Sequence, residues 1–428
     1  MKNTTEAVAD GAITDSALGA LMQEVRATQW YVGMFGDPYA LVLRAQTDDP
    51  APLYDDARAR GPLHQNMLGT WVCADHALAA RILADGRFGA RQADGSPILQ
   101  HLVPLEGAYL DLERADRDRL RERTDPLIGD GTVGRLRPLV ARAAARALAR
   151  IDTEAPFDLV GDYAAPLAAG VLTELFAIPE EDRDRFAAWC DALGPVLDAH
   201  LAPQRLAPAR SLLTALDELG AYLSDLVRER SAAPGEDLIS GLLGEPGEDR
   251  DVLAIAVLLT ITGTRIATKT MCAAALALAA YPETQDGLRG DALTAVLREA
   301  LRHDPPVHLR SLVAHADVEV EGQQIAAGSH VVVMVGAANR DPKAYPDAER
   351  FDPRRPAGQE PLLADGPFPG FAVPFALLQA EEGLAALLGL DGPLYPAGPV
   401  VRHRRAPVSR SIAEAQVAAG HHHHDDKE

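Results

Sequence analysis

The sequence predicts one large, mainly α-helical domain with a small β portion. Apolar residues recur at the three- and four-residue spacing of helices from residue 17 to about residue 301. Alanine is abundant while aromatic residues make up only 5% of the chain, which favours helix over sheet. A β-like pattern begins in earnest only after Asp317, and no repeat or linker divides the 428 residues. We therefore expect a single domain in spite of the length.

Helices are expected where apolar residues follow helical spacing and a Pro or Gly ends the run. The longest of them, residues 252–280, is apolar enough to suggest a membrane span. Arg265 and Lys269 lie in its middle, which is costly in lipid, so we expect a buried core helix. The predicted helices cover residues 17–30, 77–83, 117–122, 135–151, 164–176, 180–197, 209–230, 252–280, 293–301 and 375–388.

Strands are expected in four short segments that are rich in β-branched residues or alternate in polarity. They are residues 70–73, 317–320, 330–335, and a pair within 399–408, with a turn at Ala327-Gly328 before the third. Polar residues at both ends predict a flexible N-terminus (1–15) and a flexible or tag-like tail (411–428) that closes in HHHHDDKE. The domain itself is expected to span residues 16–410.

Composition excludes several classes of function. The chain has 62 acidic and 41 basic residues and a net charge of −21, which disfavours nucleic acid and anionic membranes as partners. Its three cysteines have no CxxC spacing, so neither a zinc site nor a disulfide framework is indicated. The N-terminus lacks an apolar secretion signal. We expect a reduced, cytoplasmic protein.

One ordered set of motifs predicts the fold family. Glu299 and Arg302 lie three residues apart on one helix face, and a buried pair of this kind needs a further partner. The set consists of EALR at 299–302, HDPPV at 303–307, DVEV at 317–320, ANRDP at 338–342 and FDPRRP at 351–356. In this order it resembles the cytochrome P450 family. The resemblance implies that Arg355 is the further partner and that Glu299, Arg302 and Arg355 hold the fold without doing chemistry; the alternative is an ordinary surface ion pair.

The motifs that bind and use haem in that family are missing. The family's ligand is a cysteine in a glycine-rich loop before the last helix, but residues 365–375 contain no cysteine. In the oxygen-binding groove of the long helix, Arg265 and Ile266 replace the usual acid and threonine. The propionate-binding HxxxR pair is reduced to Arg117 and Arg121, and another expected arginine falls on Leu312, two residues after Arg310. The resemblance therefore implies a member without haem, without metal and without oxidative chemistry.

Other chemistry is not indicated either. His403, His330, His308 and His315 are the histidines that would have to replace the thiolate as an iron ligand. The sequence has no GxSxG, GxxxxGK[ST] or HExxH motif. The paired acids at 48–49 and 180–182 are expected to be solvated caps of helices. We predict no catalytic, cofactor-binding or metal-binding residue.

A closer resemblance indicates the function. The segments QWY at 29–31, GDPY at 36–39, DDP at 48–50 and RHRRAPV at 402–408, together with the missing cysteine, look like the auxiliary proteins of antibiotic deoxysugar glycosyltransferases. Those are haem-less P450 homologues of macrolide and anthracycline pathways. The resemblance implies a non-catalytic activator that forms a hetero-oligomer with a nucleotide-sugar-dependent glycosyltransferase and stabilises its active form.

Two alternatives and one surface question stay open at this point. The same scaffold would also suit a cryptic enzyme, or a protein that holds a polyketide in the vacated haem cavity. We expect Arg265 and Ile266 to point into that cavity and fill it. The residues Trp30, Tyr31, Met34 and Phe35 follow an amphipathic helix and suit either an interface or the cap of the protein's own core, so no interface residue is assigned.

Overall fold

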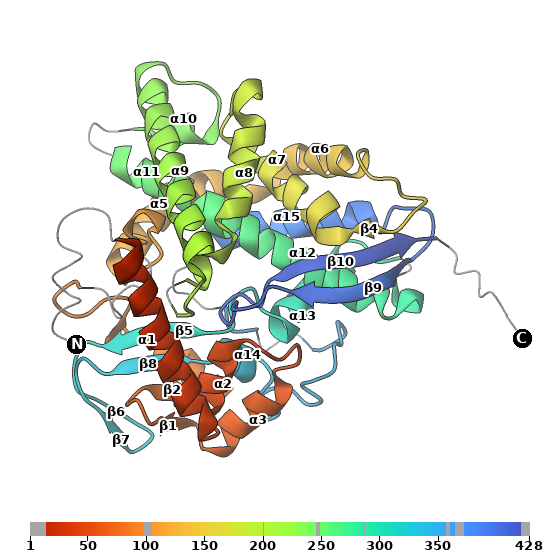
Figure 1. The fold of residues 1–428 in the computed structure, drawn as a ribbon. Coiled ribbons are helices and arrows are strands. Elements are labelled where there is room, and N and C mark those ends of the chain that lie inside the picture. Colours follow the sequence, from red (N-terminus) through yellow and green to blue (C-terminus); the bar gives the residue numbers. More distant parts are fainter. Residues whose placement is uncertain are drawn as a thin grey trace, which may run out of the picture.

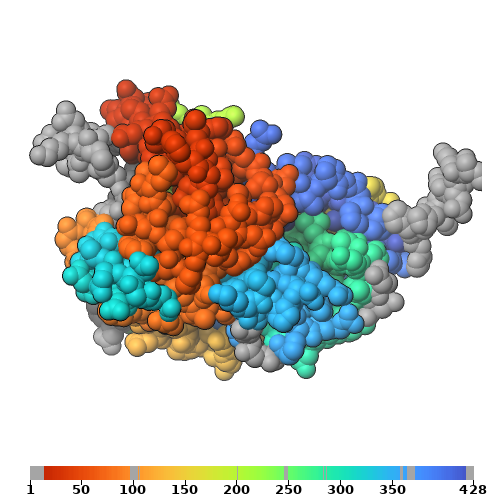
Figure 2. Space-filling view, turned by 90° about the horizontal axis from the view of Figure 1, so that it is seen from below, coloured from red at the N-terminus to blue at the C-terminus, as the bar shows by residue number. Residues whose placement is uncertain are grey.

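The computed structural model describes residues 14–96, 105–199, 201–244, 249–285, 287–356, 360–363 and 372–420. Helices form most of these residues, and a five-stranded sheet lies at one end of the molecule with the N-terminal helices around it (Figure 1). Seen from below, the N-terminal elements form one face together with the residues after 310 (Figure 2). The predicted single, mainly α-helical domain is confirmed.

The core helix runs through the centre of the helical part. It consists of α11 (Asp249–Leu258), a π-helical turn (Leu259–Gly263) and α12 (Thr264–Ala279), and it packs against α13 (Asp291–His303) and α15 (Ala372–Leu387). This helix is long and apolar enough to cross a membrane, but most of its apolar window is buried in the protein. The prediction of a core helix is confirmed.

The π-turn was not predicted. The hydroxyls of Thr260, Thr262 and Thr264 donate to carbonyls four residues earlier, at distances of 2.6–2.8 Å. Side-chain bonds of this kind compete with the main-chain ladder and bend helices. The sequence contains the three threonines at alternate positions, so the irregular turn lies where they accumulate.

The other helices lie around this core. Most predicted positions hold to within a few residues, but the helix predicted at 117–122 is longer at both ends, and the helix at Leu238–Leu242 was not predicted. Two predicted segments, 135–151 and 180–197, each divide into a helix and short turns. The helices are α5 (Arg114–Ile128), α6 (Arg137–Leu148), α7 (Ala165–Leu175), α8 (Arg183–Ala192), α9 (Leu206–Ala232) and α10 (Leu238–Leu242). Short 3₁₀ or π turns occupy Glu106–Ala108, Val133–Leu136, Leu159–Ala164, Glu180–Asp182, Gly194–Leu197 and Pro282–Thr284.

The N-terminal helices begin at side-chain caps. α1 (Asp15–Met34) starts after Thr14, α2 (Pro38–Arg44) after Asp37, and α4 (His76–Ala84) after Asp75, each of which accepts a main-chain N–H. The first helix is longer at both ends than predicted, so residue 15 already belongs to it; residues 1–13 lie outside the described part. α2 and α3 (Ala51–Ala59) were not predicted.

The five-stranded sheet has the order β1-β2-β8-β5-β3. Its strands are β1 (Leu63–Gln65), β2 (Trp71–Cys73), β8 (His330–Val333), β5 (Arg310–Ala314) and β3 (Phe88–Gly89). β2 and β8 run parallel, and the other pairs are antiparallel. The predicted valine-rich strand ends at Val333, because the chain turns there into α14 (Val335–Ala338). β6 (Val318–Val320) forms a separate hairpin with β7 (Gln323–Ile325).

The predicted C-terminal boundary is wrong. β9 (Leu394–Arg402) and β10 (Ile412–Ala419) form an antiparallel pair, which β4 (Phe157–Asp158) extends to a three-stranded sheet. Residues 412–419 are therefore part of the domain, and the predicted 399–408 pair is displaced. Ile412, Ala415 and Val417 are buried, but their alanine neighbours have low β propensity and hide the pattern. The HHHHDDKE segment lies outside the described residues.

Candidate functional site

The three predicted fold-motif residues meet in one buried network. Arg302 donates from Nε to Glu299 Oε2 at 2.8 Å and from Nη2 to Oε1 at 2.7 Å, which is the bidentate geometry that makes such pairs strong. Arg355 Nε donates to the same Oε1 at 3.1 Å. Glu299 and Arg302 are only 4% and 2% exposed. An ordinary surface ion pair is therefore not what the structure contains.

Arg302 uses its remaining donors on the main chain. Nη1 donates to the carbonyls of Asn339 and Ala348, and Nη2 to that of Arg350, at 2.8–3.0 Å. Each further bond offsets part of the cost of burying a charge. The pair thus fastens the irregular segment 339–356 to α13.

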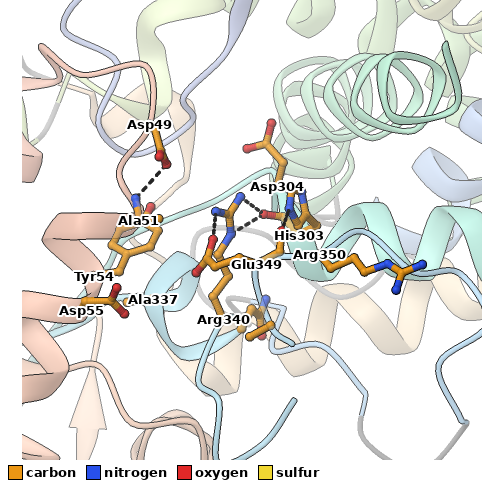
Figure 3. Close-up of polar contacts among 12 residues, drawn as sticks. Asp49, Ala51, Tyr54, Asp55, His303, Asp304, Ala337, Arg340, Glu349 and Arg350 are labelled. Atoms are coloured by element: carbon orange, nitrogen blue, oxygen red, sulfur yellow. Dashed lines mark hydrogen bonds and ion pairs between the residues drawn. The ribbon is translucent and has the colours of Figure 1, made fainter. Parts of the chain in front are cut away.

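Arg340 ties the same segment to the end of α13, as Figure 3 shows. Its Nη2 and Nε donate to the His303 carbonyl at 2.7 and 2.9 Å, and its Nη1 donates to Glu349 Oε2 at 2.7 Å. The His303 ring in turn contacts the Glu349 carbonyl at 3.0 Å. These bonds fasten the segment after Asn339 to α13, which is a structural role.

A second buried network, which the sequence did not predict, is centred on Asp304. Lys269 Nζ and Arg402 Nη2 donate to its Oδ2 at 2.6 and 2.9 Å, and His308 Nε2 lies 3.0 Å from its Oδ1. Burial alone would raise the pKa of Asp304, but Lys269, Arg402 and the His308 bond hold it well below the usual value. Asp304 is therefore an ionised centre that joins α12, α13 and β9.

One signal for this network was available in the sequence. Lys269 is a cation within an otherwise apolar helix, and a buried cation requires a partner. The partner could not be identified, because Asp304 and Arg402 are 35 and 133 residues away (304 − 269 and 402 − 269).

The described cysteines do not fit a haem-thiolate site. Cys73 lies in β2, Cys190 in α8 and Cys272 in α12, and all three are buried. Burial raises the pKa of each thiol to about 12, whereas iron ligation needs a thiolate. Residues 364–371, which correspond to most of the expected ligand loop, lie outside the described part.

The four histidines considered as replacement ligands are placed differently. Both ring nitrogens of His308 are occupied, by Asp304 and by the Tyr54 hydroxyl at 2.9 Å. Both ring nitrogens of His330 lie against hydroxyls, at 2.6 and 3.3 Å. His315 Nε2 lies 2.8 Å from the Arg91 carbonyl, and His403 is exposed just after β9. These contacts leave the two most buried rings no free nitrogen for iron.

The predicted orientation of Arg265 is wrong. A Cβ on Gly263 would lie 3.5 Å from Phe375, so Gly263 faces α15. Arg265, two residues or about 200° further round the helix, instead donates to the carbonyls of Cys190 and Asp191 at the end of α8. It therefore points away from α15. Ile266 is buried, at 2% exposure.

A half-open cleft of about 590 Å³ lies between α6, α7, α8 and α12. Arginines line it together with Glu174, Asp184 and Asp191; they are Arg146, Arg150, Arg183 and Arg265. An apolar polyketide needs a mainly apolar wall with few polar groups. This cleft does not supply one.

The end of α1 carries large apolar side chains on the surface. Trp30, Tyr31, Met34 and Phe35 are 45%, 58%, 76% and 57% exposed. The interpretation that they cap the protein's own core is therefore wrong. The sequence could not decide between the two interpretations, because it does not give the orientation of the helix against the core.

Comparison with known proteins gives a consistent result. A model of the family described as cytochrome P450 matches residues 244–361. Protein AknT from Streptomyces galilaeus is 38% identical over 94% of this chain and 96% of its own. Protein DesVIII from Streptomyces venezuelae is 36% identical over 95% of both chains.

One named monooxygenase and a solved cytochrome P450 structure are also similar. Cytochrome P450 monooxygenase PikC from Streptomyces venezuelae is 30% identical over 79% of this chain and 83% of its own. The ligand-free crystal structure of Mycobacterium smegmatis CYP164A2 is 27% identical and superposes with a TM-score of 0.76, covering 89% of this chain and 99% of that one.

Proposed function

The chain belongs to the cytochrome P450 family, and we propose that it is a non-catalytic auxiliary protein that binds a nucleotide-deoxysugar glycosyltransferase of polyketide antibiotic biosynthesis and stabilises its active form. The similarity to AknT and DesVIII over nearly the whole chain supports this proposal, because the sequence resembles the auxiliary proteins of macrolide and anthracycline pathways. The site of action is the cytoplasm, and the complex is a hetero-oligomer.

One observation carries the non-catalytic part of the proposal. The family's chemistry depends on a cysteine thiolate that pushes electron density onto iron. The cysteines of this chain are Cys73, Cys190 and Cys272, which are buried in β2, α8 and α12. Because burial raises the pKa of each thiol to about 12, all three stay protonated at neutral pH. With the ligand lost and the scaffold kept, the remaining role of the fold is to present a surface.

The mechanism is linkage between binding and conformation. A protein that binds only the active conformer of the transferase stabilises it by RT ln(1 + [L]/Kd), which is about 2.7 kcal/mol at a hundredfold excess over Kd. No group of the auxiliary protein then needs to touch the sugar. Its own contribution is a rigid scaffold, which the two buried networks at Glu299 and Asp304 provide.

The test combines a spectrum with an activity assay. The visible spectrum of the purified protein, with and without dithionite and carbon monoxide, is expected to show no stoichiometric Soret band. The cognate nucleotide-deoxysugar glycosyltransferase is expected to gain activity when this protein is added. A stoichiometric Soret band would contradict the proposal and favour a cryptic enzyme. An unchanged transferase activity would also contradict it.

A further inference from the structure

We propose that the outward face of α1, from Ala20 to Phe35, is the surface that docks the glycosyltransferase, and that the complementary patch on the transferase is apolar and edged by carboxylates. This inference rests on the proposed function. The apolar part of this face lies at the C-terminal end of α1. We call it the α1 apex, and it consists of Trp30, Tyr31, Met34 and Phe35.

The outward face of α1 is unusually poor in charge. Nine residues between 20 and 35 are exposed, and Glu24 is the only charged one among them. The exposed residues are Ala20, Gln23, Glu24, Ala27, Thr28, Trp30, Tyr31, Met34 and Phe35. On α8, by contrast, four of the six exposed residues are charged. The exposed large apolar side chains cluster at the end of this face, and such a cluster on a chain of net charge −21 indicates a surface that another protein covers.

The fold itself does not need these side chains. The opposite face of α1 buries Leu18, Met22 and Val32, and α1 contacts α2 and α9. Gln29 adds a buried hydrogen bond to the Leu201 carbonyl at 2.9 Å. The helix lies on the outside of the molecule (Figure 1), and exposed residues recur along it from Ala20 to Phe35.

The α1 apex is ordered before it binds anything. The Tyr31 and Phe35 rings meet edge to face with centroids 5.1 Å apart, and the Arg44 guanidinium lies 4.3 Å above the Trp30 ring. Arg44 also donates to the Trp30 carbonyl. Rigid aromatic side chains lose little entropy on binding, and such residues supply most of the energy in protein interfaces.

Basic residues border the apex. Arg44 covers Trp30 and Arg60 Nη2 donates to the Gly36 carbonyl at 2.7 Å, directly after Phe35. One turn before Trp30, Arg26 Nη2 donates to the Gln204 carbonyl at 3.2 Å, and Gln204 Nε2 donates to the Arg405 carbonyl at 3.2 Å. Arg26, Arg205 and Arg405 therefore lie around Gln204, and after burial the charges of Arg26 and Arg205 lower the pKa of Arg405. A local surplus of positive charge on an acidic protein fits an acidic rim on the partner.

This charge pattern also selects the kind of partner. A second copy of the chain would place arginine against arginine, and it would bring together two molecules of charge −21. An anionic bilayer would be repelled by the rest of the surface for the same reason. A transferase with an apolar patch and carboxylates around it satisfies both features.

The decisive experiment measures, by titration calorimetry, the Kd for the cognate nucleotide-deoxysugar glycosyltransferase. The double variant Tyr31→Gln/Met34→Gln is expected to weaken binding about 30-fold or more, as removal of an interface hot spot does. Tyr281→Gln is the matched control, because Tyr281 is a tyrosine of similar exposure (54%) that follows α12. It is expected to bind like the wild type.

Each outcome separates the docking surface from the proposed function. If the wild type binds and activates the transferase and the double variant does so equally well, the α1 apex is not the docking surface and the function stands. If the wild type neither binds nor activates, the function itself fails. Loss of a wild-type homodimer in the double variant by sedimentation, or wild-type binding to phosphatidylglycerol vesicles that the variant lacks, would assign the apex to a different occupant and overturn the docking proposal.

The basic border has its own readout. Arg205→Glu is expected to slow association with the transferase and to reduce its salt dependence, since rim charges act mainly on the on-rate. Arg228→Glu, on the exposed end of α9, is the control and is expected to leave the on-rate unchanged. Equal effects of both variants would show that only net charge matters and would contradict a localised acidic partner surface.

Discussion

The interior of this molecule and the α1 apex on its surface differ in where they place charged and apolar side chains. The interior contains two ion pairs, Glu299–Arg302 and Lys269–Asp304. Three of these side chains are at most 5% exposed, and Asp304 is 13% exposed. On the surface, the α1 apex exposes two aromatic rings and a methionine at more than half of their area. Charges are thus buried where apolar groups are usual, and apolar groups are exposed where charges are usual.

The difference separates what holds the fold from what the fold presents. The buried pairs belong to the P450 scaffold and fasten loops to helices without lining a described reaction site. The α1 apex contributes nothing visible to the core. Mutations in the two regions are therefore expected to differ in kind: interior changes lower stability, and apex changes lower binding.

The largest expected effect follows from breaking the Glu299–Arg302 pair. Arg302→Met removes the donor to the Asn339 and Ala348 carbonyls and leaves Glu299 with only Arg355 and the Asp352 N–H. The Arg350 carbonyl keeps its bond from Arg355. We expect the free energy of unfolding to fall by about 3–5 kcal/mol, as when one partner of a buried ion pair is removed. Urea unfolding followed by circular dichroism measures it. A loss below about 1 kcal/mol would contradict a structural role, and if the protein fails to fold, Arg355→Gln is the milder variant.

The Asp304 network allows a sharper test through two substitutions. Asp304→Asn leaves Lys269 and Arg402 without a counter-ion and is expected to cost about 3 kcal/mol. Lys269→Met added to that background is expected to restore part of the loss, because it removes an unpaired buried cation. Unfolding of the two single variants and the double variant gives the coupling energy. Simple additivity would show that the two residues do not act as a pair.

How far the sequence predicted the fold depends on the range of the interactions involved. The long core helix and the motif Glu299–Arg302 were predictable, because helical periodicity and a three-residue spacing are local signals. β10 was not, since Ile412 and Val417 are separated by alanines and the strand exists through pairing with residues such as Asp158. The end of β8 at Val333 and the start of α14 at Val335 were not predictable either.

The candidate site shows the same limit. The loss of the haem ligand could be predicted, because a missing cysteine is a property of composition. The orientation of Arg265 and the exposure of Tyr31 could not, since both depend on how a helix is rotated against its neighbours. Sequence spacing fixes which residues share a face of a helix but not which face is buried.

A pH titration compares two buried acids that differ in their partners. Among the described residues, no cation contributes to the pKa of Asp198: burial raises it to about 6, and the bonds from Ser409 and Val408 only moderate the shift. Between about pH 4 and 6 the folded state therefore holds a proton that the unfolded state has released, so stability is expected to fall as the pH rises, by up to about 3 kcal/mol. In Asp198→Asn, whose amide can keep the bonds, this part of the pH dependence is expected to disappear.

The measurement is urea unfolding of the wild type and Asp198→Asn at several pH values from 4 to 7 (about the range over which the shift acts). The difference between the two is the relevant quantity, because other groups titrate in both proteins. A difference that stays constant with pH would contradict the raised pKa. Asp304, held ionised by Lys269 and Arg402, is expected to contribute no such fall in this range.

The smallest expected change in stability is the most informative about the surface. Tyr31→Gln/Met34→Gln removes apolar area that is already in water, so the free energy of unfolding is expected to change by less than about 0.5 kcal/mol. Thermal unfolding next to Tyr281→Gln checks it. A loss of about 2 kcal/mol or more would mean that these side chains support the core after all, and the comparison between a buried scaffold and an independent docking surface would fail. An unchanged stability, together with weakened binding of the transferase, would show that the apex acts in binding and not in folding, because the isolated protein then gains nothing from exposing it.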